Sequence, residues 1–259
     1  MTFADAKQRF SNRVADYARY RPGYPAALYD LLAKQCGLQR DHVVADIGSG
    51  TGLLSKVFLD RGNRVYGIEP NAEMRSAGEE ILHSYSNFTS VDGSAESTTL
   101  PASSVDFVTV GQAFHWFDVA ATQREFRRIL KPGGWCTVVW QDRRMHETAF
   151  ARDYEYVLQR FGVDYKSVKD TYPETEKMRQ FFDPGTFRSH QLRNHQDFDW
   201  EGLQGRLRSS SYAPTENHPN YAPMIAQLRN IYNAYQNKGS VRMEYFAHVY
   251  LGQLGGNTR

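Results

Sequence analysis

The stretch Val43–Gly52, which reads VVADIGSGTG, predicts a buried strand that runs into a glycine-rich turn. Val43–Ile47 is a short, mostly apolar run of the kind found in strands buried within a parallel sheet. Glycines follow at every second position, and apolar residues then recur at helical spacing, so we expect a helix to begin around Thr51 or Gly52. A strand, a glycine turn and a helix in this order bring backbone N–H groups and a helix N-terminus close to a ligand.

The spacing of these glycines argues against two common phosphate-binding loops. The dinucleotide fingerprint G-x-G-x-x-G would need its third glycine where Leu53 stands. A P-loop would need Gly-Lys-Ser/Thr, but Gly52 is followed by two leucines. Asp46, just before the turn, also favours a cationic ligand over a phosphate. A nicotinamide-dependent oxidoreductase is therefore the weaker alternative.

A second strand, Arg64–Glu69, ends in an acidic residue. A carboxylate roughly 20 residues beyond the glycines can accept hydrogen bonds from ribose hydroxyls. An adenosine ligand with a positive centre and no phosphate is S-adenosyl-L-methionine. The pattern thus predicts S-adenosyl-L-methionine as the cofactor and S-adenosyl-L-homocysteine as its product.

Four segments in succession resemble the class I S-adenosylmethionine-dependent methyltransferases. They read DIGSGTG, GIEP, AE and RILKPGG, the last at residues 128–134. Within that class the chain resembles the type 11 group of small-molecule enzymes. DYARYRPGYP at 16–25 and QAFHWF at 112–117 resemble the branch that includes trans-aconitate methyltransferase. The resemblance runs from Tyr17 to Trp140 and implies an α/β, Rossmann-like sheet of seven strands, with the last strand pair antiparallel and a helical lid.

The resemblance also implies which residues bind the cofactor. The N-terminal segment is expected to fold over the cofactor and bring Arg21 to the methionine carboxylate, which the planar guanidinium matches; a surface arginine beside a turn is the alternative. Met74 is expected against adenine or simply in the core, and Ser94 stands where many relatives carry an aspartate for the adenine amino group. The expected residues are Tyr17, Tyr20, Arg21, Asp46, Gly48, Ser49, Gly50, Gly52, Glu69, Pro70, Met74, Ser94, Ala95, Glu96 and Gln112.

The acceptor is expected to arrive beside His115 and Trp116. Both follow a predicted fourth strand, Ser104–Val110, at the edge where open α/β sheets bind ligands. His115 is our candidate catalytic residue, as a base or as a group that orients the acceptor; packing is the alternative. Trp116 is either a wall of the pocket or core. The segment RSSSY, which contains Ser211 and Tyr212, resembles a lid loop that closes the acceptor pocket in related enzymes. The alternative interpretation is a serine-rich turn.

The remaining periodicity predicts one methyltransferase domain over residues 1–259. Residues 1–40 form N-terminal cover helices, 41–142 the cofactor-binding core, and 143–259 lid helices with the final strand pair. Asn71 is a predicted helix N-cap. Further helices are expected at 26–36, 118–130, 148–161, 200–207 and 221–235, and further strands at 88–91, 135–140, 187–198 and 241–251.

The composition indicates which kinds of binding partner to expect. The chain has 259 residues and a net charge of +2, which gives no electrostatic case for nucleic acid. No apolar run reaches membrane-span length, and residues 1–10, MTFADAKQRF, do not have the apolar h-region expected of a signal peptide. Cys36 and Cys136 are isolated, as expected for reduced thiols in a cytoplasmic protein, and form no metal-ligand pair. We expect a monomer or homodimer that acts on a small molecule.

The function predicted from the sequence is methyl transfer to an oxygen, nitrogen or carbon nucleophile of a small-molecule acceptor, with carboxylates and heterocycles among the options. Alignment and exclusion of water would supply most of the catalysis. The other alternative is a protein that binds S-adenosylmethionine without turning it over.

Overall fold

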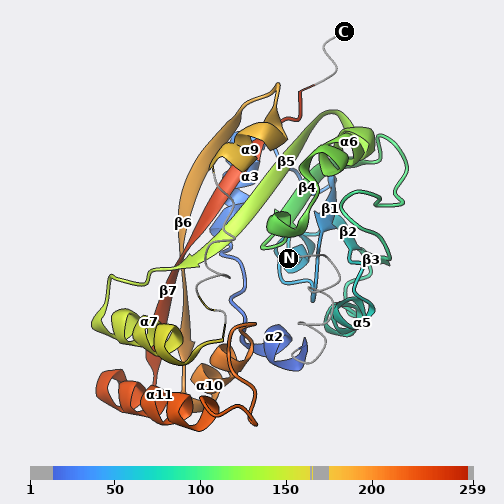
Figure 1. Cartoon of the computed structure of the whole chain (residues 1–259). Helices are drawn as coiled ribbons and strands as arrows, with labels where there is room; N and C mark the ends of the chain where they lie inside the picture. Colours follow the sequence, from blue (N-terminus) through green and yellow to red (C-terminus); the bar gives the residue numbers. More distant parts are fainter. Residues whose placement is uncertain (1–13, 164, 166–174, 256–259) are drawn as a thin grey trace.

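Seven strands form one sheet in the order β3-β2-β1-β4-β5-β7-β6 (Figure 1). The computed structural model describes residues 14–163, 165 and 175–255. Strands β1 to β5 are parallel to one another, and β7 pairs antiparallel with both β5 and β6. This confirms the predicted sheet. The strands are β1 Val43–Ile47, β2 Arg64–Ile68, β3 Phe88–Val91, β4 Val105–Gly111, β5 Leu130–Arg143, β6 Phe187–Phe198 and β7 Val241–Gly252.

The strand order reverses between β1 and β4. From β1 the chain proceeds outward to β2 and β3, then returns to place β4 and β5 on the other side of β1. Loops that leave β1 and β4 therefore diverge, which opens a crevice outside their carboxyl ends. The glycine turn after β1 lies at this crevice.

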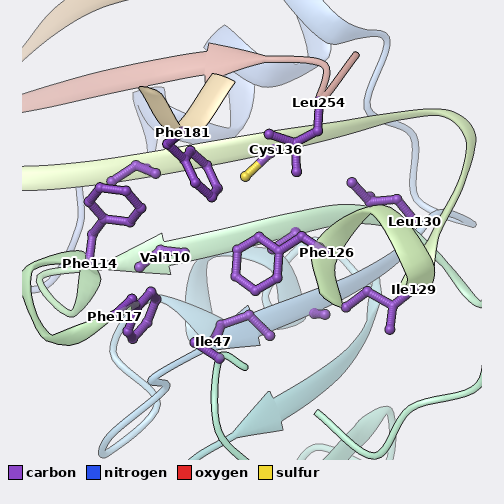
Figure 2. Packing of buried hydrophobic residues seen from close by; sticks show 14 of the residues in the cluster. Ile47, Val110, Phe114, Phe117, Phe126, Ile129, Leu130, Cys136, Phe181 and Leu254 are labelled. Atoms are coloured by element: carbon purple, nitrogen blue, oxygen red, sulfur yellow. The ribbon is translucent and has the colours of Figure 1, made fainter. Parts of the chain in front are cut away.

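Helices cover both faces of the sheet. On one face α3 (Ala27–Cys36) and α4 (Ser55–Leu59) pack through buried leucine and phenylalanine side chains. On the other face lie α6 (Val119–Ile129) and α9 (Thr175–Phe182). Figure 2 shows this second core.

Helix α9 was not among the helices predicted from the sequence. Its Met178, Phe181 and Phe182 side chains are fully buried against the sheet. The Phe181 ring meets the rings of Phe114 and Phe126 edge-on, with centroids 4.8 and 5.9 Å apart. Burial of each such side chain contributes roughly 1.5–3 kcal/mol, which holds α9 in the core layer.

Three further helices lie together near the carboxyl ends of the parallel strands. Helices α7 (Ala149–Phe161), α10 (Trp200–Arg208) and α11 (Tyr221–Tyr235) form a separate cluster around the end of β6 and the start of β7 (Figure 1). We call these three helices and the loop 209–213 the lid. Helix α2 (Val14–Tyr20) lies against α10 and also contacts α5 (Ala72–Ile81).

Some boundaries differ from those predicted. Helix α4 begins at Ser55 rather than at Thr51 or Gly52, because Gly52 has a left-handed φ of 82° that no α-helix contains. Strand β5 begins at Leu130, and its register against β4 shifts before Trp135. The predicted N-cap is confirmed: the Asn71 side chain accepts hydrogen bonds from the N–H groups of Glu73 and Met74, both at 3.0 Å.

Candidate functional site

A pocket of about 480 Å³, partly open to solvent, lies at the crevice between β1 and β4. Six predicted residues line it: Arg21, Asp46, Gly48, Ser49, Gly50 and Gln112. The prediction missed seven others: Pro22, Tyr24, Thr51, Leu53, Leu54, Gly111 and Gln141.

The glycine turn presents bare backbone to this pocket. Gly48, Gly50 and Gly52 all have positive φ, at 66°, 55° and 82°, a region that side chains disfavour. The N–H groups of Gly48 and Ser49 donate to the carbonyl of Ile68 at 2.8 and 3.1 Å, which ties the turn to β2. A backbone surface without side chains, at a topological switch point, fits an adenosyl ligand.

Glu69 fixes the same turn from the end of β2. One carboxylate oxygen accepts the N–H of Gly50 and the other the N–H of Asn71, both at 2.9 Å. These two bonds use part of the roughly four acceptor positions of a carboxylate. Glu69 thus orders the turn from the end of β2.

Asp46 lies fully buried at the base of the pocket. Its carboxylate accepts hydrogen bonds from Ser55 Oγ at 2.6 Å and Thr109 Oγ1 at 3.4 Å. Burial raises the pKa of Asp46 to about 7, against the lowering effect of these hydrogen bonds, and the nearby charge of Glu69 raises it further. A cation entering the pocket would favour the ionised form.

Gln112 and Gln141 join β4, β5 and the N-terminal segment. Gln112 has a φ of 57°, and its side-chain oxygen accepts the N–H of Gln141 at 2.8 Å. The side-chain amide of Gln141 donates to the carbonyls of Pro22 and Gly23 at 3.2 and 3.3 Å. The sequence signal for Gln141 was its position at the carboxyl end of a central strand.

In the N-terminal segment, the side chains of the adjacent residues Tyr20 and Arg21 contact different parts of the structure. Arg21 lines the pocket and donates through Nη2 to the carbonyl of Ser209 at 2.9 Å. Tyr20 turns away to pack on Gly205 of α10, where the missing side chain leaves room for its ring, and donates to Glu201 at 3.3 Å. The side chain of Tyr17 lies outside the described residues.

His115 lies beside the pocket without lining it. It belongs to the short helix η1 (Phe114–Trp116), and its ring centroid is 4.4 Å from that of Trp116 and 5.2 Å from that of Trp140. Nδ1 is buried and has no hydrogen-bond partner among the described residues. Burial, followed by the charge of Lys177, lowers the pKa of His115 to about 4, so the ring is neutral at pH 7.

The residues expected near adenine lie around the loops that follow β2 and β3. Met74 is buried, and its Cε is 3.2 Å from the point where a Cβ on Gly50 would lie. The N–H of Ser94 donates to the carbonyl of Ser97 at 3.0 Å, and Ala95 is buried in the core. Pro70, which follows Glu69, is partly buried. The Glu96 carboxylate accepts the N–H of Asp118 at 3.1 Å.

Ser211 and Tyr212, which were expected at the acceptor pocket, are partly buried and belong to the lid loop.

Within the described ranges, no group of three or more side chains is arranged to hold a metal ion. The same part of the chain contains no helix that is both long and apolar enough to span a membrane.

Asp46→Asn tests the buried carboxyl. In the folded chain the pKa of Asp46 is about 7, whereas the ordinary pKa of an aspartate is 3.8. This group therefore stabilises the fold below the ordinary pKa, and the contribution is lost as pH rises through about 7. Across that window we expect urea denaturation to show wild type losing stability relative to the variant, on the order of a few kcal/mol. Parallel pH profiles would contradict the assignment.

Comparisons with known proteins identify the family. A family model described as a methyltransferase domain matches residues 45–138. An uncharacterized methyltransferase of Mycobacterium tuberculosis is 33% identical over 172 residues, 66% of this chain and 66% of that protein. One from Geobacillus kaustophilus is 33% identical over 154 residues, 55% of this chain and 70% of that protein. A Schizosaccharomyces pombe relative is 28% identical, and the matched region spans about half of it, 53%.

Solved structures share the fold at lower identity. A candidate type II methyltransferase from Anaeromyxobacter dehalogenans has a TM-score of 0.66 and 21% identity, with 91% of this chain and 98% of that chain covered. The YcgJ protein of Bacillus subtilis has a TM-score of 0.54 and 18% identity, with 88% and 98% covered. The family match and the relatives show that residues 45–138 belong to a methyltransferase domain, and the solved structures show that the chain has the class I, Rossmann-like methyltransferase fold.

Proposed function

We propose that this chain binds S-adenosyl-L-methionine in the crevice pocket and transfers its methyl group to a small-molecule acceptor. The observation that carries the proposal is the left-handed glycine turn, with Glu69 bound to its Gly50 N–H. When bound, the cofactor supplies a methyl group on a positively charged sulfur. The product is S-adenosyl-L-homocysteine.

Each residue at the pocket has a proposed part in binding. Glu69 accepts from the ribose hydroxyls, Arg21 pairs with the methionine carboxylate, and Asp46 provides negative charge below the positive groups. Met74 packs beside the adenine. Gln112 positions the methionine part, and Gly48, Ser49, Gly52, Pro70, Ser94, Ala95 and Glu96 complete the surroundings.

The chain's contribution to the reaction is alignment. The lid and the N-terminal segment meet over the pocket through Arg21 and Ser209, so the acceptor is held against the methyl group with water excluded. We place His115 as a group that orients the acceptor, because a neutral, desolvated imidazole offers one donor and one acceptor. Trp116, Ser211 and Tyr212 belong to the same acceptor region, and the chain acts as one domain, as a monomer or homodimer.

Calorimetry with S-adenosylhomocysteine and with NADH tests the proposal. We expect binding of the first and none of the second. Tight binding of NADH would overturn the assignment. If S-adenosylhomocysteine binds but no acceptor in a broad panel is methylated, the chain is a binding protein without turnover.

Glu69→Ala should weaken S-adenosylhomocysteine binding by roughly 1–3 kcal/mol, because ribose and the Gly50 N–H both lose an acceptor. Isothermal titration calorimetry measures the change. Glu73→Ala is the matched control: Glu73 is an exposed carboxylate four residues away, and its loss should leave affinity unchanged. Equal affinities of the two variants would count against a ribose contact.

His115→Ala should keep cofactor affinity within a few-fold while sharply lowering turnover of the acceptor. A loss confined to KM would indicate orientation, and a loss in kcat of roughly 10²–10⁴ would indicate a base. His115→Phe is the control, since it retains an aromatic ring between the two tryptophans. Full activity of His115→Phe would show that the residue only packs.

A further inference from the structure

Tyr24 lines the crevice pocket beside Arg21, and both come from the N-terminal segment. A Cβ on Gly111 would collide with the Tyr24 hydroxyl and would lie 2.9 Å from the ring carbon Cζ. The hydroxyl therefore lies directly against the backbone of Gly111, which is the last residue of β4. The absence of a side chain at Gly111 is what leaves room for the hydroxyl at the end of this strand.

The backbone around Tyr24 is anchored to the sheet. Gln141 on β5 donates to the carbonyls of Pro22 and Gly23 at 3.2 and 3.3 Å. Asn194 on β6 donates to the Gly23 carbonyl at 2.8 Å. Helix α3 begins at the third residue after Tyr24. The ring is thus held in place before a ligand binds, which reduces the entropy that binding costs.

The Tyr24 hydroxyl and the Asp46 carboxylate lie on the same face of the sheet. Asp46 accepts a hydrogen bond from Thr109 Oγ1 at 3.4 Å, and Thr109 is two residues before Gly111 on β4. Residues two apart in a strand point to the same face and are roughly 7 Å apart. Asp46 therefore lies at the base of the pocket, and Tyr24 lies one step further toward the carboxyl edge.

The other side-chain oxygens of the lining belong to Ser49, Thr51, Gln112 and Gln141. The oxygens of Gln112 and Gln141 already accept hydrogen bonds from N–H groups of the chain. Ser49 Oγ is 3.1 Å from the point where a Cβ on Gly67 would lie, so it points toward β2. The Thr51 hydroxyl is buried out of solvent contact. Tyr24 and Asp46 are therefore the side-chain acceptors that this part of the pocket offers.

The composition of the lining fits the methionine part of the cofactor. Glu69 and Met74, which we propose for the ribose and the adenine, are not among the lining residues. The methionine part carries a carboxylate and an ammonium group. If Arg21 pairs with the carboxylate, the ammonium group still has three N–H donors that need acceptors.

We propose that Tyr24 binds the ammonium group of the cofactor's methionine part. Its hydroxyl oxygen accepts one N–H, and Asp46 supplies negative charge below. This inference rests on the proposed function. It assigns the amino-acid end of the cofactor to Arg21 and Tyr24 together, so the bound cofactor holds the N-terminal segment against the end of β4. A nucleoside without the amino-acid end binds without this contact.

Isothermal titration calorimetry with two ligands tests the assignment. S-adenosylhomocysteine has the amino-acid end, whereas 5′-methylthioadenosine has the same adenosine and sulfur without it. Tyr24→Phe keeps the ring and removes only the oxygen. We expect it to weaken S-adenosylhomocysteine binding roughly ten-fold or more, as for a lost hydrogen bond to a charged group, and to leave the affinity for methylthioadenosine unchanged.

Two further variants calibrate the measurement. Tyr29→Phe makes the same chemical change on α3, outside the pocket lining, and should alter neither affinity. Glu69→Ala should weaken both ligands, because both carry the ribose. Binding of methylthioadenosine by Tyr24→Phe also shows that this variant is folded.

The outcomes separate the two proposals. If wild type does not bind S-adenosylhomocysteine, the proposed function fails. If wild type binds both ligands and Tyr24→Phe weakens both equally, Tyr24 shapes the nucleoside end and the assignment is wrong. If Tyr24→Phe weakens neither, the hydroxyl does not contact the ligand, and the proposed function stands without this contact.

Discussion

The Glu69 carboxylate joins the glycine turn after β1 to the start of α5 after β2, by accepting the N–H groups of Gly50 and Asn71. Neither loop would have this geometry alone. The turn needs a left-handed backbone, and Glu69 supplies an acceptor for a backbone donor that the turn leaves exposed. One wall of the pocket, with Met74 packed beside Gly50, depends on this junction.

A second set of polar contacts closes the pocket from the opposite side. Gln141 on β5 binds the carbonyls of Pro22 and Gly23, and Arg21 binds the lid at Ser209. These contacts join segments more than 100 residues apart in the chain. They explain how a short N-terminal segment, without a large apolar face of its own, is held over the crevice.

Local patterns were enough to predict the strands and most of the helices, because apolar periodicity and caps such as Asn71 act over a few residues. They were not enough for α9, whose buried face is apparent only once α6 is packed against it. Gln141 was missed for the same reason: its partners Gln112, Pro22 and Gly23 come from distant segments. The narrower resemblance to the trans-aconitate branch stays a prediction.

The lid helices all follow β5 in the chain and pack around the antiparallel pair β6 and β7. The glycine turn and Glu69 come from the first half of the chain. The region matched by the family model stops at residue 138, before the lid begins. In evolutionary terms the lid can vary by itself: substitutions on the outer faces of α7, α10 and α11 change the lid without altering the glycine turn or Glu69, which lie in the first half of the chain.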